Sequence, residues 1–228
     1  MDFSTAIAGL WIIAGALSIS LFFRFPRIWS SIALGFILIP CGEIILLNGS
    51  VLPRLENNYI LTLGHVLGMV AMLAISSGIH EYYIFTRSLD CIENRPNIVV
   101  LVIATLLGSM LFLVVNPHPD EAVRDAIRIA ENTIWICLSL ININLLRKIY
   151  LTLKDAPIAG AFRAFLVLFL GFLLWKGSQL YMDVYQLKQI KGLYAMHYQI
   201  MAWVHLFGGV VSSLSAVFIV LYLKKVMR

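Results

Sequence analysis

The chain has 228 residues, of which 61% are hydrophobic and 13% are charged, and its formal net charge is +5. An ordinary soluble domain carries about 25% charged residues, so this composition excludes one. Nucleic-acid binding would need a basic face on a folded soluble surface, and the sequence offers no such surface. The composition therefore indicates a membrane protein.

Seven apolar stretches occupy almost the whole chain. A helix needs about 20 mostly apolar residues to cross a bilayer, and each stretch is long enough. The connections are too short for a separate domain, which usually needs at least about 50 residues. We therefore predict an all-α, multi-pass protein of the cell membrane, with residues 1–228 forming one seven-transmembrane-helix bundle. The predicted spans are 4–23, 28–49, 59–86, 97–116, 127–146, 160–182 and 196–223.

Three local features of the sequence add detail to the predicted arrangement of spans. The first stretch follows Met1 and Asp2 without a basic leader, so we interpret it as a retained helix and not as a secretory signal. The three cysteines show no spacing typical of a disulfide framework or a zinc ribbon. Before the fifth span, Asp120 and Glu121 are typical of a helix start, and we expect a short interfacial helix there.

The distribution of basic residues predicts the orientation. Lys and Arg concentrate on the cytoplasmic side of membrane proteins, and seven spans place successive connections on alternating sides. Eleven of these residues fall on the side of the C-terminus, and five fall on the other side. We therefore expect the N-terminus outside and the C-terminus in the cytoplasm, with the basic side attracted to anionic lipids of the bilayer.

Five ionisable side chains fall at a similar depth in the outer third of the predicted bundle: Glu43, His65, Glu131, Lys176 and His205. Ionisable groups inside a membrane are candidates for a functional site because an unpaired charge in hydrocarbon costs several kcal/mol. The alternatives are structural. Lys176 could reach the interface by snorkelling, or it could pair with Glu43 as a bridge between helices. We expect at least three of the five to point into the bundle.

The two histidines suggest a cofactor. Imidazoles from two helices at equal depth can ligate the two faces of a haem b iron, so His65 and His205 are candidate metal ligands. Arg124 or Arg128 could pair with the haem propionates, and Gly68 and Gly208 lie near the histidines and could make room for the macrocycle. Glycines also allow helices to pack closely, which explains both residues without a cofactor. His80 falls near the inner surface and is a candidate for proton handling.

Three functions remain open. The first is a cytochrome b-like subunit that passes electrons between the quinone pool and an outer-side redox protein through one haem. The second is a seven-helix sensor, receptor or small carrier with an outward-facing polar pocket, whose signal would pass to a separate partner. The third is a metal-dependent intramembrane enzyme that uses the same imidazole and carboxylate groups.

Overall fold

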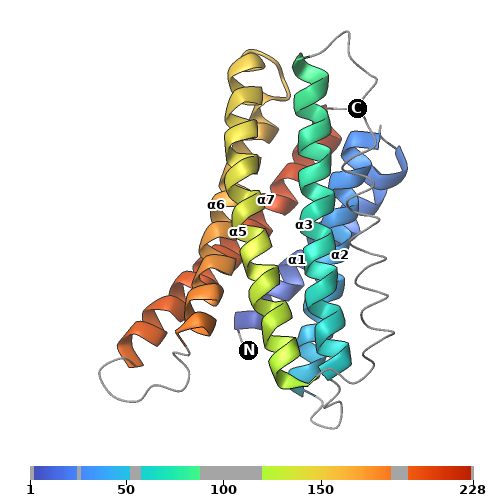
Figure 1. Cartoon of the computed structure of the whole chain (residues 1–228). Coiled ribbons are helices and arrows are strands. Elements are labelled where there is room, and N and C mark those ends of the chain that lie inside the picture. The colour runs from blue at the N-terminus through green and yellow to red at the C-terminus, as the bar shows by residue number, and fades with distance from the viewer. Residues whose placement is uncertain (1–2, 25–26, 52–57, 88–119, 186–194, 227–228) are drawn as a thin grey trace.

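The structure is a computed structural model that describes residues 3–24, 27–51, 58–87, 120–185 and 195–226. Every regular element in these ranges is an α-helix, and all six helices are long and apolar enough to cross a membrane (Figure 1). The helices are α1 (Phe3–Arg24), α2 (Arg27–Val51), α3 (Asn58–Arg87), α5 (Glu121–Thr152), α6 (Ala159–Val184) and α7 (Ala195–Val226).

The predicted all-helical architecture is thus confirmed for six helices, whose length and composition are compatible with a multi-pass membrane bundle. The span predicted at 97–116 lies outside the described residues, so the count of seven stays a prediction. The orientation of the termini also stays a prediction. The helix start expected at Asp120 and Glu121 is confirmed, because the Asp120 carboxylate accepts a hydrogen bond from the Val123 amide. The segment before residue 127 is not a distinct short helix but the first part of α5, which runs without a break from Glu121 to Thr152.

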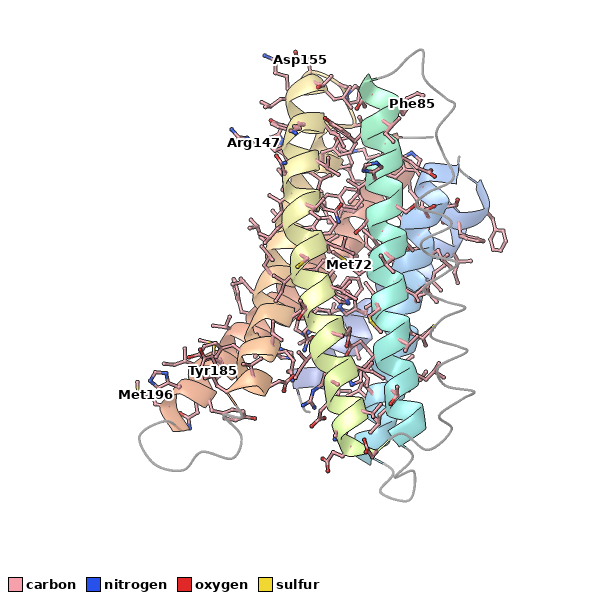
Figure 2. All side chains as sticks on the ribbon, viewed as in Figure 1. Met72, Phe85, Arg147, Asp155, Tyr185 and Met196 are labelled. Atoms are coloured by element: carbon pink, nitrogen blue, oxygen red, sulfur yellow. The ribbon has the colours of Figure 1, made fainter. Side chains whose placement is uncertain are left out.

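The six helices pack as a closed ring. Each one contacts mainly two neighbours, in the order α1, α2, α3, α5, α6, α7 and back to α1. Within the ring, α2 and α6 end at the same end of the bundle at which α3, α5 and α7 begin (Figure 1). We call this the cavity end. Side chains from neighbouring helices fill the space between the ribbons, and Met72 of α3 is completely buried there (Figure 2).

An aromatic layer occupies the middle of the ring. Trp11 of α1 stacks on Phe172 and Trp175 of α6, with ring centroids 5.9 Å and 6.1 Å apart. Trp135 of α5 meets the Phe172 ring edge-on at 4.6 Å, and Phe36 of α2 lies 6.2 Å from Trp11. Aromatic pairs at these separations are attractive beyond the area that they bury. This layer, which we call the aromatic floor, joins four helices beneath the cavity end.

Close contact between α6 and α7 depends on small residues. A Cβ added to Gly208 would overlap the backbone nitrogen of Trp175 and lie 2.8 Å from the carbonyl oxygen of Gly171. A Cβ added to Gly171 would lie 2.9 Å from the backbone nitrogen of Ser212. Glycines let membrane helices approach this closely, and here they bring the two backbones together at the depth of the aromatic floor.

This contact predicts that Gly208→Ala destabilises the bundle. The added methyl group meets backbone atoms that cannot move aside, and such overpacking costs about 1–3 kcal/mol. Gly9→Ala in α1 is the matched control because no atom lies within 4 Å of its added Cβ. Thermal unfolding in lipid nanodiscs should show a lower Tm for Gly208→Ala alone. Equal melting temperatures for the two variants would contradict this account of the interface.

Candidate functional site

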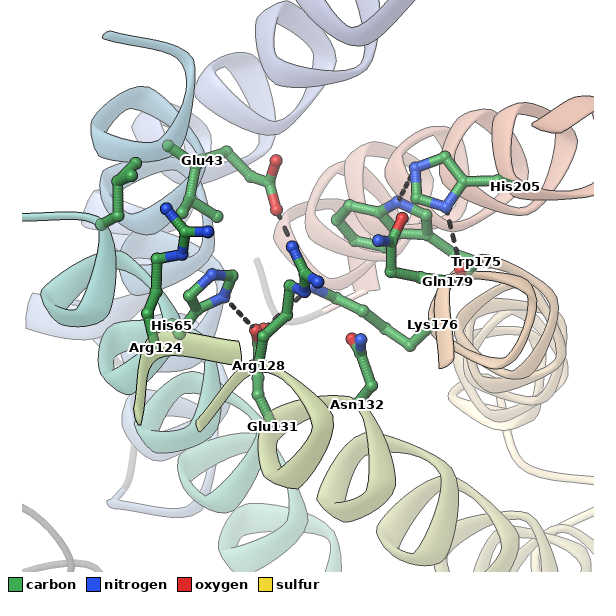
Figure 3. A pocket seen from close by; sticks show the side chains of 12 residues that line it. Glu43, His65, Arg124, Arg128, Glu131, Asn132, Trp175, Lys176, Gln179 and His205 are labelled. Atoms are coloured by element: carbon green, nitrogen blue, oxygen red, sulfur yellow. Dashed lines mark hydrogen bonds and ion pairs between the residues drawn. The ribbon is translucent and has the colours of Figure 1, made fainter. Parts of the chain in front are cut away.

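A partly open cavity of about 420 Å³ lies at the cavity end of the bundle (Figure 3). Five helices contribute to its wall: α2, α3, α5, α6 and α7. The lining residues are Glu43, Leu46, Leu61, His65, Arg124, Arg128, Glu131, Asn132, Trp175, Lys176, Gln179 and His205. We call it the polar cavity. All five ionisable residues selected from the sequence line it.

Glu131 is the centre of the charged network. It is 2% exposed, and its two carboxylate oxygens contact different helices. Oε2 lies 2.7 Å from Nδ1 of His65, and Oε1 accepts a hydrogen bond of 2.8 Å from Nζ of Lys176. A buried carboxylate needs this kind of compensation because it has lost its hydration. Glu131 therefore couples α3, α5 and α6.

Lys176 points into the bundle, where its side chain is 8% exposed. Its ammonium lies 3.9 Å from Oε1 of Glu43, in addition to its hydrogen bond to Glu131. It also lies over the rings of Trp175 and Trp135, 4.7 Å and 5.0 Å from their centroids. Aromatic faces stabilise a cation at these distances. The snorkelling alternative for Lys176 is therefore wrong.

Two arginines of α5 stand nearer the mouth, one helical turn apart. Arg124 donates hydrogen bonds through Nη2 to Glu121, at 3.0 Å, and to Asp125, at 3.3 Å. Arg128 lies 3.1 Å from Oδ2 of Asp183 through Nε and 3.4 Å from Asp125 through Nη2. These arginines were considered from the sequence only as partners for haem propionates.

The sequence did not indicate the polar residues around Asp183 as part of the site. Asn132 and Gln179 both line the cavity and donate hydrogen bonds to the Asp183 carboxylate. Helical spacing could have found part of this group, since Gln179 and Asp183 are four residues apart and share one face of α6. No sequence pattern indicates that α5 supplies the other partners.

The two histidines do not face each other as a pair of iron ligands. Both ring nitrogens of His205 contact Trp175: Nε2 accepts a hydrogen bond of 3.2 Å from the indole N–H, and Nδ1 lies 3.0 Å from the carbonyl oxygen. Nδ1 of His65 is bonded to Glu131. Figure 3 shows the two imidazoles on opposite sides of the cavity, with the Lys176 ammonium between them.

The nearby glycines serve helix packing. A Cβ on Gly68 would overlap the Glu131 carboxylate, and the carbonyl oxygen of Gly68 accepts a hydrogen bond of 3.1 Å from Trp135 Nε1. The space beside Gly208 is occupied by the backbone of α6. The described residues therefore do not fit a haem held between His65 and His205, and the haem hypothesis stays a prediction without support from this geometry.

The remaining candidates give no metal site either. His80 lies fifteen residues beyond His65 on α3 and is not part of the cavity wall. Among the described residues, no group of three or more His, Cys, Asp or Glu side chains is arranged to hold a metal ion. The metal-dependent enzyme stays a hypothesis that no described cluster supports.

Comparisons of the chain with protein-family models, with curated proteins and with solved structures found no match.

The buried network predicts a strong effect of Lys176→Met. This substitution leaves Glu43 and Glu131 without their shared cation. Removing one partner of a buried ion pair lowers the free energy of unfolding by about 3–5 kcal/mol, because the other charge stays buried without compensation. Adding Glu131→Gln to that variant should recover part of the loss. Arg147→Met, an exposed cation on α5, is the control and should change stability by less than about 0.5 kcal/mol. Unfolding in bicelles measures all three, and equal effects of Lys176→Met and Arg147→Met would contradict the network.

Proposed function

We propose that this protein is a membrane receptor or sensor that binds a small zwitterionic molecule in the polar cavity. One observation carries the proposal. Glu43 and Arg128 are the two charged side chains of the cavity wall that make no hydrogen bond within the described part of the chain, although every other charged wall residue makes at least one.

Glu43 has spare capacity to accept hydrogen bonds. Its side chain is 21% exposed, and its nearest cation, the Lys176 ammonium, lies 3.9 Å away and is hydrogen-bonded to Glu131 instead. A carboxylate can accept about four hydrogen bonds. An ammonium group of a ligand is the partner that supplies both the donors and the opposite charge.

Arg128 has spare capacity to donate. Its guanidinium lies near Asp125 and Asp183, but Nε makes no hydrogen bond of acceptable geometry to either. Guanidinium carries five N–H donors in a planar fork that matches a carboxylate. Because Glu43 and Arg128 both point into one cavity, the ligand that satisfies both carries an amine and a carboxylate (Figure 3).

The aromatic floor favours a receptor or sensor over a carrier. Trp175 lines the cavity and stacks on Trp11, which also packs against Phe36 on the far side of the ring. A polar ligand that reached the cavity would meet this apolar layer and stop there. Ligand contacts at Trp175 would then reach α1 through the stacked Trp11 ring and α2 through the tilted contact between Trp11 and Phe36. The carrier is the second candidate, and uptake into proteoliposomes would favour it.

The proposed orientation places the cavity mouth outside the cell. Leu61 lines the cavity and makes no polar contact, so Leu61→Cys in a variant lacking Cys41, Cys91 and Cys137 tests this placement. We expect a membrane-impermeant thiol reagent to label intact cells. Labelling only in inverted vesicles would reverse the orientation.

Matched ligands test the proposed chemistry. We expect 4-aminobutyrate, β-alanine or glycine to bind at least about tenfold tighter than butyrate or butylamine, since one charge-assisted hydrogen bond contributes about 1.5–3 kcal/mol. Isothermal calorimetry on the protein in nanodiscs measures these affinities. The three zwitterions differ in the separation of their charges, so the best one reports the span between Glu43 and Arg128.

Substitutions test which cavity residue binds the ammonium and which binds the carboxylate of the ligand. Glu43→Gln should reduce zwitterion affinity to that of butyrate and leave butyrate unchanged, whereas Arg128→Gln should weaken both. Arg147→Gln should change neither. Preferential binding of butyrate by the unmodified protein would keep the cavity as a binding site but reject the zwitterion. If none of the five compounds binds, the proposed function is rejected.

A further inference from the structure

A second hollow lies between the first turns of α6 and the last turns of α7, at the end of the bundle opposite the polar cavity. Its volume is about 600 Å³. The lining residues are Gly160, Arg163, Ala164, Val167, Leu214, Ser215 and Phe218. We call it the Arg163 groove, and we propose that it is a binding site for an anionic phospholipid, with the phosphate on Arg163 and an acyl chain along the apolar wall.

The wall of the groove is apolar and faces outward. Val167, Leu214 and Phe218 are each about half exposed. Gly160 leaves room for the ring of Tyr222, whose hydroxyl donates a hydrogen bond of 2.6 Å to the carbonyl oxygen of Pro157. Tyr222 is thereby held in place at the end of the groove. Such a surface between two transmembrane helices fits a hydrocarbon chain better than water.

Arg163 supplies the charge. Its guanidinium lies 5.4 Å from the centroid of the Tyr150 ring of α5, and this cation–π contact restricts its position. Within the described part of the chain, no carboxylate lies within ion-pair distance of it. An arginine at the edge of a membrane is stabilised by an anion, and guanidinium binds phosphate oxygens through paired N–H donors.

The surroundings favour an anionic lipid over a zwitterionic one. Other cations stand at the same end of the bundle: Arg147 and Lys148 near the end of α5, Lys154 in the turn that follows, and Lys224 and Lys225 at the end of α7. Basic pockets between helices are typical sites for anionic lipid headgroups, because each nearby Lys or Arg adds attraction. A free phosphate would satisfy the charge of Arg163 but leave the apolar wall uncovered.

Lipid competition tests this site. The whole protein is placed in nanodiscs of phosphatidylcholine and phosphatidylglycerol in equal amounts, and the lipids that remain bound after gentle detergent extraction are counted by native mass spectrometry. We expect phosphatidylglycerol to be retained preferentially. Arg163→Gln should reduce that preference by about fivefold, the value of one cation near an anionic membrane. Arg163→Lys should keep part of it.

Two controls separate the groove from general basicity. Arg147→Gln removes an exposed cation at the same end that does not line the groove, and it should reduce the preference much less than Arg163→Gln does. Ala164→Phe keeps Arg163 but fills the apolar wall, and it should reduce retention of the lipid. Equal losses for Arg147→Gln and Arg163→Gln, an unaffected Ala164→Phe variant, or no preference in the unmodified protein would each overturn the proposal. Binding of zwitterions at the other end of the bundle is measured separately and does not bear on this result.

Discussion

The hydrogen-bonded ion pair between Glu131 and Lys176 is the interaction on which the cavity end depends. Both groups are buried in the ring of helices, where an isolated charge would be too costly to retain. Because Glu131 also contacts His65, and Lys176 also approaches Glu43, four helices are held in one relative rotation. The wall of the polar cavity is therefore a consequence of charge compensation, and removing either partner would disturb the whole site.

The aromatic floor gives this network its environment. Trp135 and Trp175 contact the Lys176 ammonium with their faces and, with Trp11 and Phe172, separate the charges from the remainder of the bundle. Low polarity below the network strengthens its ion pairs and restricts polar ligands to the side above it. The same tryptophans thus stabilise the buried cation and form the floor of the cavity, and in the proposed receptor they would connect a bound ligand to α1.

The polar cavity and the Arg163 groove differ in the way their charges are satisfied. In the cavity, the charges compensate one another as ion pairs, and among the described residues Glu43 and Arg128, which bear opposite signs, are the charged wall residues that make no hydrogen bond. In the groove, Arg163 lies beside half-exposed apolar side chains, and no carboxylate of the described residues is within ion-pair distance of it. The first arrangement suits a small molecule with two charges, and the second suits an amphiphile with one.

Much of the fold was predictable because a membrane helix is formed by consecutive residues, so the length and apolar composition of each stretch located the six helices that the structure describes. The position of a residue along its helix gives its depth, and this placed five ionisable residues at one level: Glu43, His65, Glu131, Lys176 and His205. Length, composition and depth do not determine how each helix is rotated about its own axis. Only the tertiary structure decided that His205 bonds Trp175 instead of facing His65, and that Gly68 makes room for Glu131 instead of a macrocycle. The physical reason is that depth follows from the rise per residue within one helix, whereas pairing depends on packing between helices far apart in the sequence.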